Sequence, residues 1–401
     1  MSIPLRLEPT KSPPPRGWAL WSLGFRPFYL LAAMLAALSV PLWALEYVGA
    51  LPTPYLRGSL WHAHEMVFGF TLAVVVGFLF TAGRNWTNQP TPSGLALQGL
   101  AALWLAGRVL VLTPWGAVAA AANVAFPLAA AAGLGRALWA GRSRRNYFFV
   151  GLLVLLAGAC ALVHAVQLGW IRANPTQGVQ VGLDVMLVIV AVMGGRVIPM
   201  FTNAAILTAR AQRRPWLERA AIAGVGVLLA GDLALGAAGS ALPELTAAIA
   251  LAAAAVHALR WWLWQPWKTL GTPLVWVLPA GYAWIPVHLL LRAASEVGWI
   301  APGPAVHALT VGAIGGLTIG MMTRTARGHT ARPLRADGAD VAAYVLVLAA
   351  GVVRVGLPLL LPAAQGVAVL ASAAAWSAGF TLYAVRYGPW LCRPRLDGQA
   401  G

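Results

Sequence analysis

The sequence predicts an all-α, polytopic membrane protein built as a bundle of about twelve transmembrane helices. Hydrophobic residues make up 60% of the 401 residues and charged residues only 10%, whereas a soluble globular protein has about 25% charged residues. The mean hydropathy is +0.73. Apolar segments long enough to cross about 30 Å of hydrocarbon recur along the whole chain. This composition excludes an ordinary soluble enzyme and a disordered chain.

The expected spans follow one another with short loops between them. We predict helices over residues 28–49, 60–82, 94–112, 115–138, 147–170, 179–202, 217–237, 242–264, 273–295, 302–324, 340–360 and 363–387. Each stretch is apolar over the length that a span requires. The chain therefore divides into an N-terminal tail (1–27), a transmembrane domain (28–387) and a C-terminal tail (388–401). Little sequence remains for a soluble domain.

The basic residues predict the orientation of the bundle. With twelve spans, 22 of the 28 Arg and Lys residues fall in the tails and loops of one side, and only Arg57 and Arg172 fall on the other. Because cytoplasmic loops retain basic residues, we expect both termini in the cytoplasm. The formal net charge of +17 is therefore accounted for by basic residues on one side of the lipid bilayer, and it requires no nucleic-acid partner.

The histidines gather at one predicted depth. The span directions and a rise of 1.5 Å per residue place five of the seven in the outer halves of four spans: His62, His64, His164, His288 and His307. Neutral imidazole is the commonest metal ligand; it suits copper and iron and holds haem in proteins. We predict that these five histidines bind metal, although hydrogen-bonded interhelical histidines would give the same pattern. We expect structural roles for His257 and His329 on the inner side.

The densest cluster is the pair His62 and His64, and its meaning depends on where the helix starts. On a regular helix the two imidazoles are about 200° apart and serve two centres, with Glu65 and Met66 on the face of His62. If the helix begins only after His64, extended backbone puts both imidazoles on one side and they can serve one centre.

Charged groups inside spans are costly and mark functional positions. Glu65 and Asp184 are predicted to be catalytic as proton carriers, and Asp184 could instead orient a histidine. Arg196, at the inner end of the sixth span, requires an anionic partner such as a lipid phosphate, a carboxylate or a haem propionate. It is therefore predicted to contribute to cofactor binding with His62, His64, His164 and His307.

The tenth span carries a stripe of small residues. Gly312, Gly316 and Gly320 recur at a spacing of four, with Gly315 beside them. Such a stripe lets another helix approach closely, or it leaves room for a flat macrocycle. The sequence alone keeps both interpretations.

Eight runs of residues occur in a characteristic order: FRPF (25–28), WHAHEM (61–66), NWT (85–87), GGRVIPMFT (194–202), GYAW (281–284), HALTVGAIGG (307–316), MMTR (321–324) and GHT (328–330). Together they resemble the NnrS family of bacterial membrane proteins. The resemblance extends from about residue 25 to residue 335. It implies a twelve-span protein of the bacterial inner membrane that contains haem and copper. The implied role is in nitric oxide metabolism, in denitrification or in resistance to nitrosative stress.

The resemblance also assigns positions. His62, His64, His164, His307 and His329 match family histidines, and Arg196 matches the arginine of its motif. The chain departs from the pattern at Pro279, where many members have a histidine before the Gly-Tyr pair.

Three functions are compatible with these features. The first is a redox enzyme that reduces nitric oxide to nitrous oxide at haem and copper near the periplasmic face, with a quinol or a small cytochrome as electron donor. The haem would be of the b type, because no C-x-x-C-H motif is present. The second is a non-catalytic protein that binds nitric oxide or protects against it. The third is a transporter of a metal or small solute.

Overall fold

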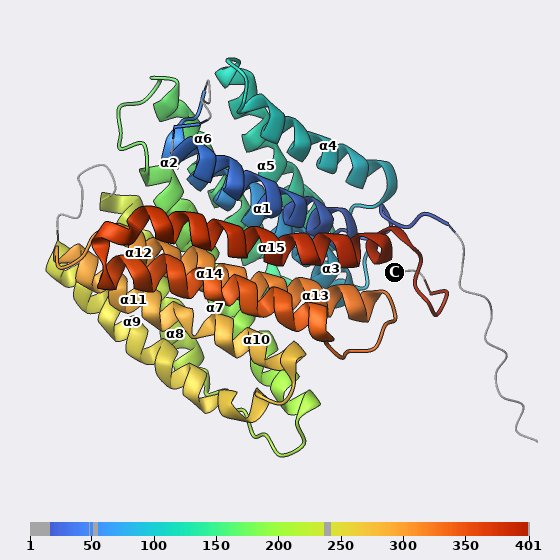
Figure 1. Ribbon diagram of the computed structural model, residues 1–401. Helices are drawn as coiled ribbons and strands as arrows, with labels where there is room; N and C mark the ends of the chain where they lie inside the picture. The colour runs from blue at the N-terminus through green and yellow to red at the C-terminus, as the bar shows by residue number, and fades with distance from the viewer. Residues whose placement is uncertain (1–16, 48, 51–54, 236–241, 400–401) are drawn as a thin grey trace, which may run out of the picture.

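The computed structural model describes residues 17–47, 49–50, 55–235 and 242–399 (Figure 1). All regular secondary structure in these residues is helical. Arg6, Lys11 and Arg16 of the predicted N-terminal tail lie outside the described residues, as do residues 236–237 at the predicted end of the seventh span.

The first half of the chain forms α1 (Phe25–Tyr47), α2 (Gly58–His64), η1 (Glu65–Thr71), α3 (Leu72–Thr87), α4 (Gly94–Leu110), α5 (Gly116–Ala140), η2 (Arg144–Asn146), α6 (Phe148–Gln167) and α7 (Gln177–Ala205). The second half forms α8 (Pro215–Leu235), α9 (Pro243–Leu263), η3 (Pro266–Thr269), α10 (Pro273–Tyr282), α11 (Trp284–Glu296), α12 (Pro302–His307), η4 (Ala308–Gly315), α13 (Gly316–His329), α14 (Gly338–Leu360), η5 (Pro362–Ala364) and α15 (Gln365–Cys392). Every predicted span therefore coincides with a helix or with a run of consecutive helices.

In the part of the chain that the structure describes, ten helical segments are long and apolar enough to cross a membrane. The other two predicted spans correspond to α4, which has 17 residues, and to α8, which carries Glu218, Arg219 and Asp232 within its 21 residues. The molecule is a polytopic α-helical membrane protein. The count of twelve crossings and the cytoplasmic side of the termini stay predictions.

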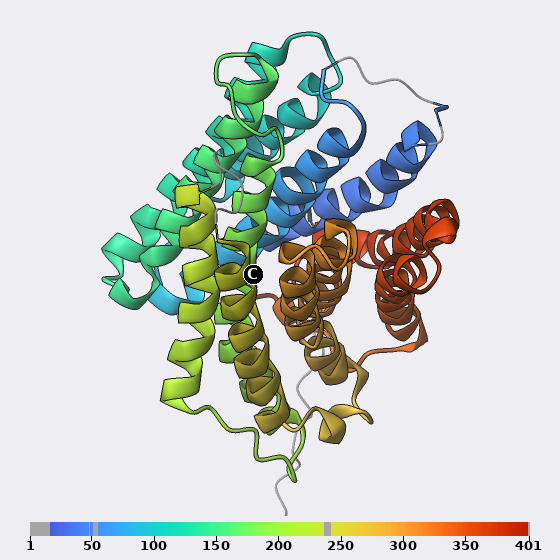
Figure 2. The same cartoon turned by 90° about the vertical axis from the view of Figure 1, so that its left-hand side faces the viewer.

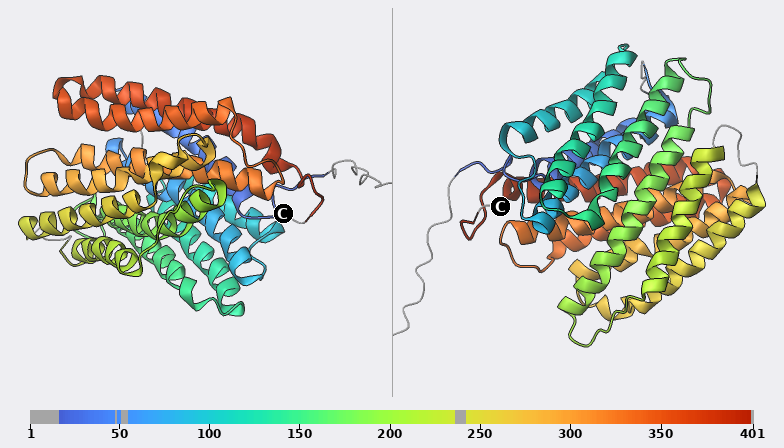
Figure 3. Two further views of the ribbon diagram at one scale, coloured as in Figure 1. Left: turned by 90° about the horizontal axis from the view of Figure 1, so that it is seen from below. Right: turned by 180° about the vertical axis from the view of Figure 1, so that it is seen from behind.

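Three long segments form the centre of the bundle. They run through Gly58–Thr87, Gln177–Ala205 and Pro302–His329, and 83%, 78% and 72% of their most apolar stretches are buried inside the protein. The views in Figures 2 and 3 agree that α8 with α9 and α14 with α15 lie at the periphery. Residues on the three central segments are therefore shielded from lipid. A prosthetic group requires such a shielded position.

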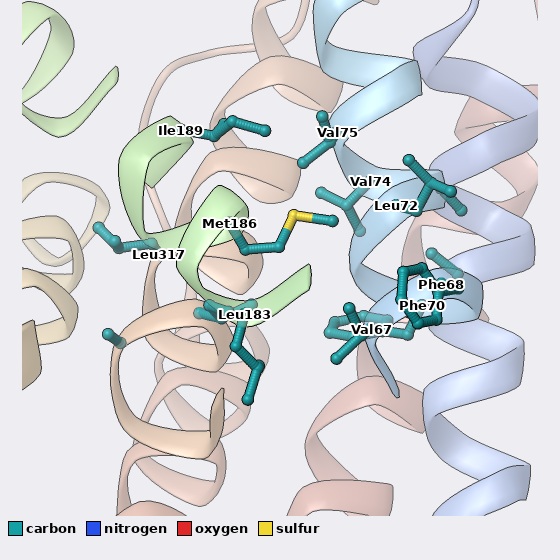
Figure 4. Close-up of a cluster of buried hydrophobic side chains, with 14 of the residues drawn as sticks. Val67, Phe68, Phe70, Leu72, Val74, Val75, Leu183, Met186, Ile189 and Leu317 are labelled. Carbon is teal, nitrogen blue, oxygen red and sulfur yellow. The ribbon is translucent and has the colours of Figure 1, made fainter. Parts of the chain in front are cut away.

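The central segments pack through branched and aromatic side chains. Met186 of α7 points toward Val74 and Val75 of α3 (Figure 4). A Cβ placed on Gly182 would lie 3.0 Å from both Val67 and Phe68, so the absence of a side chain lets α7 approach η1. This contact fixes the position of η1, and with it the residues that precede it.

The glycine stripe of the tenth span serves helix packing. A Cβ on Gly315 would lie 2.6 Å from Trp376, one on Gly316 would lie 2.8 Å from Gly281 Cα, and one on Gly320 would lie 2.7 Å from Val277. A Cβ on Gly312 would overlap Trp284. The helix-packing interpretation of this stripe is confirmed.

Two π-helical segments interrupt the central spans beside candidate ligands. The segment η1 begins at Glu65, directly after His64, and η4 begins at Ala308, directly after His307. Segments of π-helix are rare and are found most often at functional sites, because they rotate the side chains around them out of regular helical register.

The first and last helices close the bundle on itself. Ala19 N donates to Cys392 O at 2.8 Å, Arg26 Nη1 donates to Leu391 O at 2.9 Å, and Ser377 Oγ donates to Ala37 O at 2.9 Å. The two ends of the described chain thus meet at one end of the bundle (Figure 1). An even number of spans requires this arrangement.

Candidate metal and cofactor site

The short helix α2 presents its two histidines to different surroundings. It begins at Gly58, so the alternative in which the helix starts after His64 is wrong. The ring of His62 stacks on Trp43, with centroids 4.2 Å apart, whereas His64 is fully buried against α6. The two imidazoles therefore belong to two centres on opposite faces of α2.

His64 forms a compact cluster with two residues of α6. Its Nε2 lies 3.2 Å from His164 Nε2 and 3.8 Å from Cys160 Sγ, and one ligand atom from each residue lies within 4.8 Å of the others. All three side chains are buried. Cys160 and His164 share a helix face because they are one turn apart.

A second layer of side chains orients both imidazoles. Glu65 Oε1 lies 2.9 Å from His64 Nδ1, and Arg108 Nη1 lies 3.1 Å from the same carboxylate oxygen. Tyr55 Oη lies 3.0 Å from His164 Nδ1. Burial raises the pKa of Tyr55 to about 12, so the phenol stays neutral. Carboxylate and hydroxyl partners on the far nitrogen are the contacts that orient metal-ligating histidines.

This donor set fits copper. Two imidazoles and one thiolate are the ligands of trigonal His₂Cys copper sites, and soft thiolate favours Cu(I) or zinc over hard cations. Metal–nitrogen bonds of about 2.0–2.1 Å would allow one ion to reach both Nε2 atoms, which lie 3.2 Å apart.

The other face of α2 borders a cavity of about 410 Å³. His62 of α2 and His307 of α12 both line it. Flat aromatic walls are provided by Trp43 and Trp376, and Arg354 of α14 adds a positive charge. The volume lies in the range of pockets that bind cofactors, which are mostly apolar with a few convergent polar groups.

The two histidines of this cavity differ in their hydrogen bonds. His307 Nδ1 donates to Gly303 O at 2.7 Å, which leaves Nε2 with its lone pair. His62 Nδ1 is buried and has no hydrogen-bond partner among the described residues. His307 thus has the backbone contact typical of a metal ligand, and His62 retains unused hydrogen-bonding capacity.

These residues fit a haem. His307, oriented by its own backbone, would hold the iron, the aromatic walls would match a flat ring, and Arg354 would pair with a carboxylate. The orphaned Nδ1 of His62 is the kind of buried polar atom that a bound group satisfies.

A second cavity, of about 520 Å³, is lined by the predicted ligand His288 and by Arg292, the ion-pair partner of Asp184. The Nδ1 of His288 donates to Ala305 O at 2.8 Å, and its Nε2 has no partner among the described residues. Arg292 Nη1 pairs with Asp184 at 2.8 Å, and Arg292 Nη2 pairs with Asp232 at 2.7 Å. The structure therefore brings neither His288 nor Asp184 into the two histidine centres of α2, and their predicted metal and catalytic roles stay untested.

Arg196 lies far along α7 from both centres. It is 16 residues from Gln180, which lines the first cavity, so the two are about 24 Å apart along the helix axis. Its Nη1 donates to Asn146 Oδ1 at 2.7 Å, and its guanidinium lies over the rings of Trp86, Phe148 and Phe149. The partners are thus an amide and aromatic faces, where an anion was expected.

The histidines expected to be structural lie outside the two centres. Both ring nitrogens of His257 have hydrogen-bond partners, Tyr282 Oη at 2.6 Å and Ala221 O at 3.2 Å. The ring of His329 packs against Phe25. His257 is therefore a matched control for the histidine substitutions below.

Sequence reasoning missed Cys160, Tyr55, Arg108 and Arg354 as parts of the site. The spacing of Cys160 and His164, one helical turn apart in one span, was a usable signal. Arg108 and Arg354 were visible as cations inside spans. Glu65 was expected on the face of His62, but the π-helix that begins there turns it toward His64 and Arg108.

Glu65→Gln should weaken copper binding by about 10–100-fold without abolishing it, because outer contacts to ligating histidines have effects of this size. The measurement is copper affinity by competition with a chelator of known strength. Glu244→Gln, an exposed acid at the start of α9, is the control. Equal affinities in all three proteins would contradict an orienting role for Glu65.

The fold and these centres define a polytopic membrane protein with a buried candidate metal cluster. The profile of the NnrS protein family matches residues 19–395, and the chain belongs to this family. Membership is consistent with a membrane protein related to nitric oxide and suggests metal or haem binding. No curated protein matches the sequence.

Proposed function

We propose that the protein is a haem- and copper-containing oxidoreductase that binds nitric oxide and reduces it to nitrous oxide. We further propose that it crosses the bacterial inner membrane twelve times, with both termini in the cytoplasm. The 22 to 2 asymmetry of basic residues supports this orientation.

His307 would hold a b-type haem in the first cavity, with Arg354 as the partner of its carboxylates. His64, Cys160 and His164 would hold copper on the other face of α2. Bound there, the haem iron would supply a site for nitric oxide and the copper a one-electron relay. Because the two sets of ligands lie on opposite faces of α2, the geometry favours separate centres over a shared pair of metals.

His62 would be the catalytic side chain of the cavity. Stacking on Trp43 fixes its ring, and its unused nitrogen can donate a hydrogen bond or a proton to a ligand bound beside it. Forming nitrous oxide and water from two nitric oxide molecules consumes two protons and two electrons. A positioned general acid contributes about 10²–10⁴-fold to such a step.

Gln180 links this cavity to two acids, Asp184 and Asp232. It lines both cavities, and its Nε2 lies 3.2 Å from Asp232 Oδ2 and 3.4 Å from Asp184 Oδ1. Asp184, which lies on the far side of Gln180 from the proposed haem cavity, would thus supply protons. Glu65 would orient His64. Neither acid would touch nitric oxide.

One observation carries the proposal: two histidines line a single cavity beside a His–Cys–His cluster, one oriented by backbone and one with a nitrogen that has no partner among the described residues.

His62→Ala should retain haem and copper but lose at least about 100-fold of nitric oxide turnover, because it lacks the proposed acid. The assay supplies purified full-length protein with an artificial electron donor and measures nitrous oxide by gas chromatography. His257→Ala should turn over like the wild type. A metal-loaded wild-type protein that binds nitric oxide but forms no nitrous oxide would refute reduction and identify a binding protein.

A further inference from the structure

The second cavity is lined by several hydrogen-bond acceptors. His288 is only 4% exposed. Because its Nδ1 must donate to the carbonyl of Ala305, its Nε2 carries a lone pair and no proton. His288 lines the cavity, and this buried nitrogen has no partner among the described residues. A buried acceptor of this kind is satisfied by a ligand that donates.

The carboxylates of this cavity add further acceptors. Asp232 and Glu296 both line it. The one cation among the lining residues, Arg292, is already engaged by Asp184, Asp232 and Glu296. The charged groups therefore offer oxygen lone pairs, and the cation has little capacity left for an anion. An occupant with hydroxyl or amine donors complements these acceptors.

Part of the rim of the cavity is apolar. Val227 of α8 and Leu242 and Leu245 at the start of α9 line it and are 51%, 51% and 53% exposed. In a membrane bundle, exposed apolar side chains contact acyl chains. Asn174 and Thr176 are exposed polar residues that also line the cavity. Its rim is therefore amphipathic, which suits a bilayer-soluble occupant with a polar head.

The cavity adjoins the proposed haem cavity. Thr176, Gln180, Pro302 and Val306 line both. A bilayer-soluble molecule with hydroxyl donors, held next to a redox centre, has the chemistry of a hydroquinone. We propose that this cavity binds a membrane quinol, with one hydroxyl donating to His288 Nε2 and the other to Asp232. The quinol is the electron donor of the proposed function, on which this inference rests.

The overall reaction balances. Oxidation breaks the two O–H bonds of the quinol and releases two electrons and two protons, with His288 and Asp232 as the first acceptors of the protons. The oxidant is nitric oxide, two molecules of which take up two electrons and two protons to give nitrous oxide and water. One quinol and two nitric oxide thus become one quinone, one nitrous oxide and one water.

The test measures binding of decylubiquinol to the full-length purified protein by anaerobic equilibrium dialysis, with and without bound metals. Wild-type protein should bind it saturably. His288→Leu should bind about tenfold more weakly, as expected for one lost hydrogen bond in a buried site. His257→Leu should bind like the wild type. Thr246→Trp, which fills the cavity from α9, should bind as weakly as His288→Leu and keeps the test valid if that variant does not fold.

The rate of haem reduction after anaerobic mixing with decylubiquinol gives a second readout. It should fall in both cavity variants, while reduction by dithionite is unchanged. Equal quinol binding in wild-type and both variant proteins would overturn the site, as would undiminished haem reduction by decylubiquinol in Thr246→Trp. Nitrous oxide formation with an artificial donor but without quinol binding would overturn this inference alone. Quinol binding and haem reduction without nitrous oxide would overturn the proposed function and leave the quinol site standing.

Discussion

His307→Ala should yield a protein without haem, so that the purified variant lacks the Soret band of wild-type protein expressed with haem supplied. The reason is that His307 is the cavity histidine whose Nδ1 is held by a carbonyl, that of Gly303 at 2.7 Å, and it therefore presents Nε2 as a preformed ligand. The surrounding cavity stays open in the variant, but no oriented nitrogen remains for iron. Haem per chain, measured as the pyridine haemochrome, checks the result.

Two further proteins sharpen this test. His257→Ala removes a fully buried histidine whose nitrogens are both used inside the protein, so its haem content should match the wild type. Added imidazole should restore haem to His307→Gly, because the small molecule can occupy the vacated space. Full haem content in His307→Ala would show that the axial ligand lies elsewhere.

Cys160→Ala should leave the protein without copper at stoichiometric loading, while its haem content stays normal. The thiolate is the softest of the three ligands and the one that selects copper over harder ions. Its sulfur lies 3.8 Å from His64 Nε2, within reach of a shared ion. The copper content per chain, measured by inductively coupled plasma mass spectrometry, tests this prediction.

The chain provides a matched control for this substitution. Cys392, at the end of α15, is the other free cysteine, and Cys392→Ala should retain copper. His164→Ala should lose copper as Cys160→Ala does. If Cys160→Ala retained copper and His164→Ala lost it, only the imidazoles would be copper ligands and Cys160 would have a packing role.

Hydropathy predicted the helices because a lipid-exposed backbone must satisfy its own hydrogen bonds, which leaves helices as the solution for long apolar segments. The ends are set by local features that hydropathy does not contain. The ninth span, for example, is divided after Tyr282 into α10 and α11. The second and tenth spans contain π-helices, which hydropathy does not predict.

The sequence could predict how far along its helix each site residue lies, but not the direction in which its side chain points around the helix axis. His62, His64 and His288 were expected in one layer, yet they face three different surroundings. Depth follows from counting residues along an axis, whereas the direction of a side chain depends on how each helix is rotated against its neighbours. Cys160 joined the cluster for the same reason: only the packed bundle brings α6 against α2.

The contact between α1 and α15 has a consequence for how the protein folds during its synthesis. Arg26 and the carbonyl it bonds at Leu391 are 365 residues apart, so this contact cannot form until the ribosome has made the final helix. Until then the inner face of α1 has to be shielded by lipid, by an insertase or by a transient neighbour. A premature stop between residues 355 and 365 would leave that face of α1 without its partner helix permanently, even though the ligands of both proposed centres had already been synthesised.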